Sequence, residues 1–501
     1  MKIGRILLVV STLLNLGNRI ATAQELTPAQ ARADISFLKH KLDGLHPGMG
    51  YYTPQARMEQ LYDSLYNRLT SPISYLSFYH HVSPLVTALK DGHTNLNHRR
   101  NYIGKQTRYL PFYIRPVDSR YFISHNVSSD TSLQRGTELL MINGRAVADL
   151  HRELMDADRS GSDGDNLTGR RFWSMVQFAD YYAAWFGSAD SVRITYRLTT
   201  DTLIREERIA CLSLQDFRRT IQRRYGVDID RRPNLSVKVV DTLTHTAVLR
   251  VSSFMGLKKK DPFQWAFNRR LKQAFKQIKE ENVKNLVVDM QGNGGGIVLN
   301  SARLLRYWMP NSFRMMEHED MKRAARAELV TPWNPFSALN FSLQYRSEKG
   351  GGFTSRSLRH KYRPRRKDAF TGNLYFLLNG ASFSATTTVL AKTLDAGMGT
   401  FVGEPSGSAY WGDFAGHFKT IILPNSRIQV RIPLKKLTHS VSTDRSNGFT
   451  VEPDFSVSRS YNDLMTNRDY ILDYTLQLIR QGVVARRPGQ TQPVQVSALQ
   501  E

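Results

Sequence analysis

Residues 377–386 (LLNGASFSAT) combine residue types that could catalyse acyl transfer. An apolar run ends there in a turn of small residues, and a helical pattern begins at Ser384. A serine at such a junction presents its hydroxyl at the edge of a sheet, beside a helix N-terminus whose dipole and N–H groups favour an oxyanion. Ser384 is therefore the candidate nucleophile. The alternative is a serine that only caps the helix.

A glycine-rich turn and a histidine add to this chemistry. Residues 286–296 (LVVDMQGNGGG) indicate a buried strand that runs into a turn, where glycine allows positive φ and leaves backbone N–H groups accessible. The spacing of these glycines matches neither a P-loop nor a dinucleotide-binding fingerprint. Asp289 is expected to pin this turn by accepting backbone N–H bonds. His93 follows a helical pattern that ends at Gly92, so its alternative role is helix capping.

Taken together and in this order, these segments resemble the tail-specific (C-terminal processing) protease family of serine peptidases. Further motifs extend the resemblance over most of the chain: His46-Pro47-Gly48, Asn143-Gly144, and residues 403–407 (GEPSG), 423–426 (LPNS) and 451–454 (VEPD). The resemblance implies an acyl-enzyme on Ser384, with an oxyanion hole made by the N–H groups of Ala385 and Gly295. It implies no metal or organic cofactor, and we find no cluster of His, Cys and acids with metal-ligand spacing.

The general base departs from the better-known branch of this family, which uses a lysine at the position of Ala409. Lys392 lies eight residues beyond the serine, about 12 Å away by axial rise, and cannot reach it. The sister branch, similar to the tricorn core peptidase, uses a histidine from the N-terminal helical region, and His93 matches it. An imidazole can accept the serine proton at neutral pH. That branch also implies an orienting acid, for which Asp444 is the nearest match and Glu452 the competitor.

Three regions are expected to position these residues. Residues 24–104 have helical periodicity and predict an N-terminal helical region. Residues 105–212 have short alternating strands around an Asn-Gly turn and resemble part of a PDZ domain, with an unrelated β-rich insert as the alternative. Residues 235–480 alternate buried strands and amphipathic helices, which predicts an α/β catalytic domain with a parallel sheet. The resemblance implies the spiral type of this domain, shared with Clp-type proteases and crotonases.

The first 23 residues have the pattern of a secretory signal peptide. Lys2 and Arg5 precede an apolar run that is too short to cross a bilayer, and an Ala-Thr-Ala site precedes Gln24. No later segment predicts a transmembrane span. We therefore expect an exported protein, in the periplasm, in the cell envelope or outside the cell; a buried N-terminal helix is the alternative. Cys211 is the only cysteine, so stability must come from the cores.

The chain is strongly basic, with a formal net charge of +25. The basic residues are spread along it without a recognition-helix, zinc or stacking-aromatic pattern, so we expect no nucleic acid partner, although acidic surfaces stay open. A protein or peptide substrate is the expected partner, and residues 487–501 are expected to be a disordered tail. Two other classes stay open: an inactive family member that binds peptide ends or apolar ligands, and a basic interaction protein whose PDZ-like module recruits peptide ends.

Overall fold

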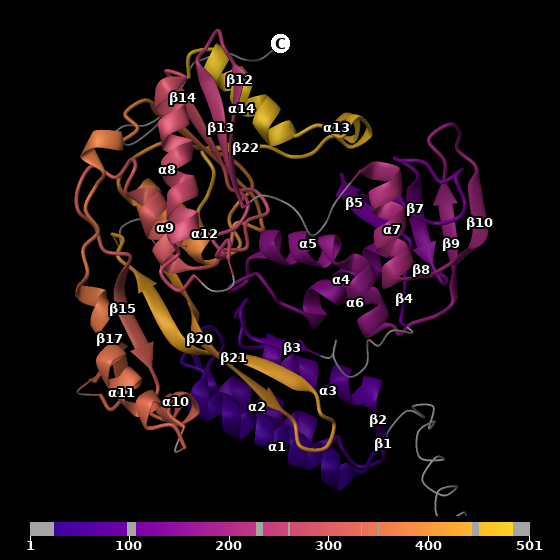
Figure 1. Ribbon diagram of the computed structural model, residues 1–501. Coiled ribbons are helices and arrows are strands. Elements are labelled where there is room, and N and C mark those ends of the chain that lie inside the picture. The colour runs from indigo at the N-terminus through magenta and orange to yellow at the C-terminus, as the bar shows by residue number, and fades with distance from the viewer. Residues whose placement is uncertain are drawn as a thin grey trace, which may run out of the picture.

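A computed structural model describes residues 25–97, 107–226, 234–258, 261–331, 333–348, 350–442 and 450–483. The predicted signal peptide, Gln24, Asp444 and the predicted tail lie outside these residues. The expected fold class is confirmed: the chain is a multi-domain α/β protein, and Figure 1 shows its parts. Within the described ranges, none of the helices combines the length and the apolar character that a membrane span needs.

Three helices and a short strand pair make up the N-terminal region. Thr27 and Gln30 form a capping box at the first helix, and Pro28 takes its first position, where a missing N–H costs nothing. Ile35, Leu38 and Leu42 then recur at helical spacing and are buried. The elements are β1 (Glu25–Leu26), α1 (Pro28–Leu45), α2 (Gln55–Asn67), β2 (Ile73–Ser74) and α3 (Tyr75–Thr87).

An antiparallel sheet covers the apolar face of these helices. Alternate residues of its longest hairpin, such as Val430, Ile432 and Leu434, share one buried core with Ile35 and Leu38. The region predicted as one catalytic domain therefore lends a hairpin to the N-terminal helices. The strands are β3 (Asn95–Asn97), β15 (Met316–Met321), β16 (Tyr345–Ser347), β17 (Phe353–Ser355), β20 (Gly412–Ile422) and β21 (Gln429–His439), and α10 (Ala325–Leu329) and α11 (Pro335–Gln344) lie at its edge.

Residues 107–226 form a second body around an antiparallel sheet in the order β10-β9-β7-β6-β5. The predicted Asn143-Gly144 turn is present, with φ of 49° and 77° at these residues, as a two-residue hairpin requires. The predicted helix after it is α4, whereas α5 and α6 were not predicted. The elements are β4 (Arg108–Tyr109), β5 (Phe112–Val117), β6 (Arg120–Asn126), β7 (Glu138–Ile142), β8 (Arg145–Ala146), α4 (Val147–Ala157), α5 (Leu167–Val176), α6 (Phe178–Trp185), β9 (Ser191–Arg197), β10 (Ile204–Ala210), β11 (Leu212–Ser213) and α7 (Leu214–Tyr225).

The third body is the predicted α/β layer with a parallel sheet. Its strands follow the order β12-β13-β14-β18-β19-β22, and all neighbours except β12 and β13 are parallel. Helices α8, α9 and α12 cover one face and α14 the other. The elements are β12 (Leu235–Asp241), β13 (Thr246–Val251), α8 (Trp265–Glu280), β14 (Asn285–Asp289), α9 (Val298–Leu305), β18 (Asn373–Leu378), α12 (Ala385–Asp395), β19 (Thr400–Gly403), β22 (Phe455–Ser456), α13 (Tyr461–Thr466) and α14 (Tyr470–Arg480).

Strands β14 and β18 are adjacent and parallel, so their carboxyl ends meet at one edge of the sheet. The glycine turn follows β14, and the turn that carries Ser384 follows β18. Ligand and catalytic sites of α/β sheets lie at this edge because the loops converge there. The topology therefore brings together two segments that are about 90 residues apart in the sequence, as residues 293 and 383 illustrate.

Candidate active site

Ser384 occupies the junction between β18 and α12 in a strained conformation. Its φ of 56° and ψ of −125° are rare for a residue with a side chain. The Ser384 N–H donates to Ser408 Oγ at 2.7 Å, which helps to hold this backbone. The Ser384 side chain makes no capping hydrogen bond to α12. The hydroxyl is thus not used as a helix cap, which disfavours the alternative role for this serine.

The glycine turn packs directly against the Ser384 turn. Phe383 N–H donates to Asn293 O at 3.1 Å. Gly295 has a φ of 95°, and a Cβ at this position would lie 2.9 Å from Ser384 Cβ and 3.0 Å from Ala385 N. No side chain fits in such a space, so only glycine permits this approach. The turn therefore lies close enough to line a pocket beside the serine.

The two predicted oxyanion donors differ in their hydrogen bonding. Within the described part of the chain, Ala385 N–H has no acceptor, and it lies at the N-terminus of α12, where the helix dipole favours an anion. Gly295 N–H instead donates to Asn293 Oδ1 at 2.9 Å, and Asn293 Nδ2 donates to Val251 O at 2.8 Å. Ala385 is thus the donor that stands ready, while the Gly295 N–H is occupied by Asn293 in this arrangement.

His93 lies beside the same turn, buried with 6% of its surface exposed. Its ring packs against Phe383 at 4.5 Å between centroids and against Phe418 at 5.8 Å on β20. Phe383 immediately precedes Ser384, so the imidazole is next to the nucleophile turn. Among the described residues, neither ring nitrogen is hydrogen bonded to Ser384 Oγ. Nδ1 has no hydrogen-bond partner there, so His93 does not act as a helix cap either.

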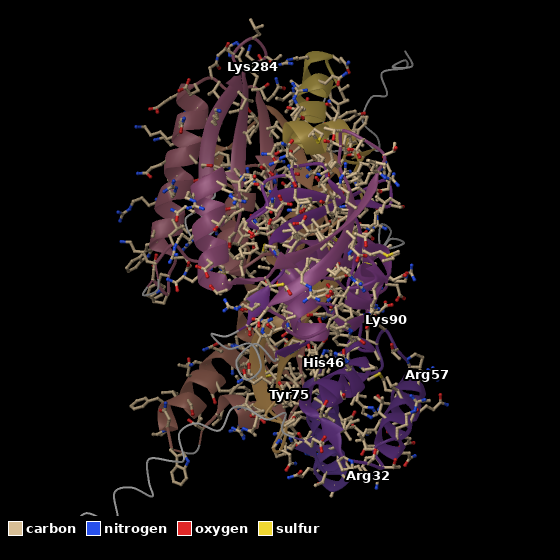
Figure 2. All side chains as sticks on the ribbon, turned by 90° about the vertical axis from the view of Figure 1, so that its right-hand side faces the viewer. Arg32, His46, Arg57, Tyr75, Lys90 and Lys284 are labelled. Atoms are coloured by element: carbon tan, nitrogen blue, oxygen red, sulfur yellow. The ribbon has the colours of Figure 1, made fainter. Side chains whose placement is uncertain are left out.

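A hydrogen-bond network holds Asp91 beneath His93. Gly48 N–H donates to His46 Nδ1 at 3.0 Å, which leaves His46 Nε2–H to donate to Asp91 Oδ2 at 3.0 Å. The His93 backbone N–H donates to Asp91 Oδ1 at 2.9 Å, and His93 Nδ1 lies 3.8 Å from the same oxygen. Burial raises the pKa of Asp91, but the bond from His46 and the nearby His93 outweigh it and hold the pKa well below its usual range. The His46 and Lys90 labels in Figure 2 mark this part of the molecule.

Asp163 is a second buried carboxylate at His93 that sequence reasoning missed. Its Oδ1 accepts the Gly92 N–H at 2.9 Å, while Oδ2 has no partner among the described residues. Burial, followed by repulsion from Asp91, raises the pKa of Asp163 to about 7. Burial lowers the pKa of His93, but the surrounding carboxylates, Asp91 foremost, outweigh burial and raise it above its usual value. The site therefore stabilises a proton on this imidazole.

The loop that carries Asp163 connects the segments of the site. Gly161 N–H donates to Gly92 O at 2.8 Å, and Asp163 N–H donates to Gly407 O at 3.2 Å. Gly407 N–H in turn donates to Ser382 O at 2.9 Å, two residues before Ser384. The Gly-Ser-Asp composition of residues 160–166 was the available sequence signal, but it predicts only a loop.

Asp91, His93 and Asp163 are also the residues that could hold a metal ion. One ligand atom from each lies within 4.8 Å of the others. Both carboxylate oxygens of Asp91 already accept hydrogen bonds, Oδ2 from His46 and Oδ1 from the His93 N–H. We therefore interpret the cluster as a partner for the His93 imidazole. The third acid near His93, Asp413 on β20, is buried as well, and its Oδ1 has no partner within the described ranges.

The acids expected from the resemblance do not join this cluster in the described structure. Asp444 lies outside the described residues. Glu452 is exposed, and its Oε1 accepts a hydrogen bond from Thr450. The local pattern near the Pro-Asp motif could not show that Asp91 and Asp163 surround His93, because these residues reach it from other segments. Asp289 accepts the Gln291 N–H at 3.0 Å, the pinning contact that was expected of it.

Other basic side chains near α12 are engaged elsewhere. Lys392 donates to Ser440 O, Lys435 pairs with Glu319, and Lys419 pairs with Glu328 at 2.7 Å.

His439 is a second buried histidine beside α12. Its Nδ1–H donates to Tyr410 O at 3.0 Å, and its Nε2 lies 2.9 Å from Thr388 Oγ1. Both of its nitrogens are used in structural contacts, and burial lowers its pKa. Of the two buried histidines by this helix, only His93 has a ring free of such bonds in the described structure.

Comparisons with known proteins agree with this geometry. Residues 245–457 match the model of peptidase family S41. Among solved structures, mature CPAF is similar with a TM-score of 0.63 at 16% identity, over 92% of this chain and 99% of that chain. Mature CPAF complexed with lactacystin gives 0.62 at 16% identity over 91% and 99%, and a CPAF mutant gives 0.63 at 14% over 91% and 98%.

These structural identities support the fold alone, and no curated protein sequence matches the chain. The family match itself spans the segments that contain Ser384, Ala385 and Gly295. The predicted resemblance to the tail-specific proteases is thereby confirmed. This protein belongs to peptidase family S41 and is a serine-type peptidase.

Proposed function

We propose that this protein is an exported endopeptidase that cleaves peptide bonds through an acyl-enzyme on Ser384, with His93 as the general base. The observation that carries the proposal is the contact of three distant segments at one point. The strained Ser384, the Gly295 turn and the buried His93 all pack around Phe383 and Ala385. Strain in a non-glycine residue next to a buried titratable cluster is typical of a catalytic site.

The reaction follows from these positions. Ser384 Oγ attacks the scissile carbonyl carbon while its proton passes to His93 Nε2, and the carbonyl oxygen becomes an oxyanion beside Ala385 N–H. The His93 proton then passes to the leaving amine, which frees the first product. Water attacks the ester with the same base and releases the second product. In the free enzyme Ser384 and His93 are not hydrogen bonded, and catalytic bonds of this kind commonly tighten only when substrate binds.

We assign the orienting role to Asp91 and Asp163. Both are buried, and each has an oxygen near His93 Nδ1. An acid at this nitrogen stabilises the imidazolium and directs Nε2 toward the substrate. Glu452, exposed and bonded to Thr450, is less well placed for this role. Asp444 retains the role that the family resemblance implies.

The Asp163→Asn variant tests this assignment by its pH profile. The carboxylate of Asp163 raises the pKa of His93, so removing its charge should lower that pKa. Since the base must be neutral, activity falls as pH drops through the His93 pKa, and the variant's acidic limb should shift to lower pH. The measurement is kcat/KM between about pH 5 and 9, a range that covers an imidazole. Asn keeps the oxygen that accepts the Gly92 N–H, so an unshifted limb would contradict the assignment.

A fluorophosphonate probe tests the proposed function itself. An activated serine reacts with such a probe, and mass analysis of the digested protein should locate the label on Ser384. An unlabelled but folded protein would favour the alternative of an inactive family member that binds peptide ends. In that case the antiparallel sheet around β7 and β9, which we propose to be PDZ-like, would be the first surface to test for peptide binding.

Export has its own test. The pattern of a basic start, a short apolar run and small residues predicts signal peptidase cleavage before Gln24. We expect the protein recovered from the cell envelope or the medium to begin at Gln24, as mass analysis of its N-terminal peptide would show. Recovery of the uncleaved chain from the cytosol would contradict the proposed localisation.

A further inference from the structure

Helix α11 presents an apolar face to solvent, far more exposed than a folded core element. Four side chains make up this α11 face: Trp333 (94% exposed), Phe336 (75%), Leu339 (57%) and Leu343 (68%). Their spacing of three, three and four residues places them along one side. Phe341, on the opposite side, is buried against Phe353. Scattered exposed apolar residues are ordinary, but a continuous stripe of this kind marks an interaction surface.

An arginine-lined cavity lies on the flank of the same helix. The cavity has a volume of about 840 Å³, and Ser342 and Phe341 of α11 are part of its wall. Four arginines line it: Arg323, Arg326, Arg346 and Arg356. All four are exposed, and none forms an ion pair within the part of the chain that the structure describes. Glu328, the acid nearest in sequence to Arg326, is already paired with Lys41 and Lys419.

We propose that this surface docks the protein on a membrane of anionic phospholipids. An amphipathic helix with Trp, Phe and Leu on one face and arginines beside it lies in the plane of a membrane interface, with its apolar side chains at the acyl boundary. The arginines then reach the lipid phosphates, which the planar guanidinium binds in bidentate fashion. Over residues 322–359 the chain has seven Lys and Arg against two acids, so the charge of the surface complements an anionic membrane.

The position and charge of the surface favour this partner over a second copy of the chain. Figures 1 and 2 both show the α10–α11 segment projecting at the lower edge of the molecule, where a planar surface can reach it. In a two-fold dimer through the α11 face, the arginines beside it would oppose the same arginines of the other copy, which is unfavourable. A free anion would use the cavity but would leave the apolar stripe in water.

Vesicle co-sedimentation of the full mature chain tests the proposal. We expect binding to equimolar phosphatidylglycerol and phosphatidylcholine vesicles, and at least about ten-fold weaker binding to phosphatidylcholine alone. The Trp333→Ser/Phe336→Ser variant should bind the anionic vesicles at least about ten-fold more weakly, because apolar insertion is lost. The Arg323→Gln/Arg346→Gln variant should lose about five-fold for each arginine. Hydrolysis of a soluble peptide should be unchanged in both, so docking is separable from the proposed peptidase activity.

A matched control uses Phe263 and Trp265, which are also exposed aromatic residues but lie at the start of α8. Phe263→Ser/Trp265→Ser should leave vesicle binding unchanged. The proposal is overturned if the mature chain does not bind anionic vesicles, or if the α11 variant binds them as the wild type does, since general basicity would then suffice. It is also overturned if the wild type is a dimer that the α11 variant dissociates, because a second copy would then cover this face.

Discussion

Replacing Ser384 with alanine is expected to lower kcat/KM for peptide hydrolysis by at least about ten-thousand-fold. The substitution removes one oxygen, the atom that would attack the scissile carbonyl, and no other side chain of the site can replace it. The fold should be retained. Ser384 Oγ makes no hydrogen bond within the described structure, and the N–H that bonds Ser408 stays in place. Initial rates on a peptide substrate, labelling by a fluorophosphonate probe and thermal unfolding together measure the result.

The neighbouring Ser382 provides the matched control for this variant. It is fully buried, its Oγ donates to Met290 O at 3.0 Å, and it accepts the Asn379 N–H at 3.1 Å. Ser382→Ala should therefore cost about 1 kcal/mol of stability or somewhat more, with labelling of Ser384 retained. If Ser382→Ala abolished labelling while Ser384→Ala kept near-full activity, the nucleophile would have been misassigned.

Replacing His93 with alanine is expected to be about as damaging as Ser384→Ala, and the double variant should be scarcely worse than either. A serine hydroxyl is a poor nucleophile while it keeps its proton, so base and nucleophile act as one unit and their losses do not add. In the wild type, activity should fall on acidification through a pKa above about 6.5, since carboxylates raise the pKa of His93. Rates of the single and double variants over a pH series measure both effects.

His439 gives this experiment a control of the same residue type and similar burial. Both of its ring nitrogens serve structural contacts, to Tyr410 O and Thr388 Oγ1. His439→Gln should change thermal stability more than it changes the pH profile. A fully active His93→Ala enzyme would falsify the histidine mechanism, and Lys419 and Lys435 would then be tested although both are paired with acids.

Local sequence patterns were enough for the elements whose contacts are local. The start of α1 at Thr27 and Pro28, and the hairpin turn at Asn143-Gly144, depend on hydrogen bonds and dihedral preferences within four residues. The junction at Ser384 is local in the same way, because a buried strand, small residues and a helix follow one another directly. The glycines after β14 indicated a close backbone approach, and Gly295 makes that approach to Ser384.

The amino-acid sequence by itself determined the α/β class, the family and the candidate nucleophile, because these depend on periodicity and on short contiguous motifs. Only the tertiary structure decided which acids surround His93. Asp163 contacts Gly92 across 71 residues, and no periodicity relates two loops at that separation. The same holds for the Gly295 N–H, which Asn293 occupies, and for β21, which covers the N-terminal helices. Such contacts arise from how elements pack, since burial selects the faces that meet, and residues distant in sequence meet on those faces.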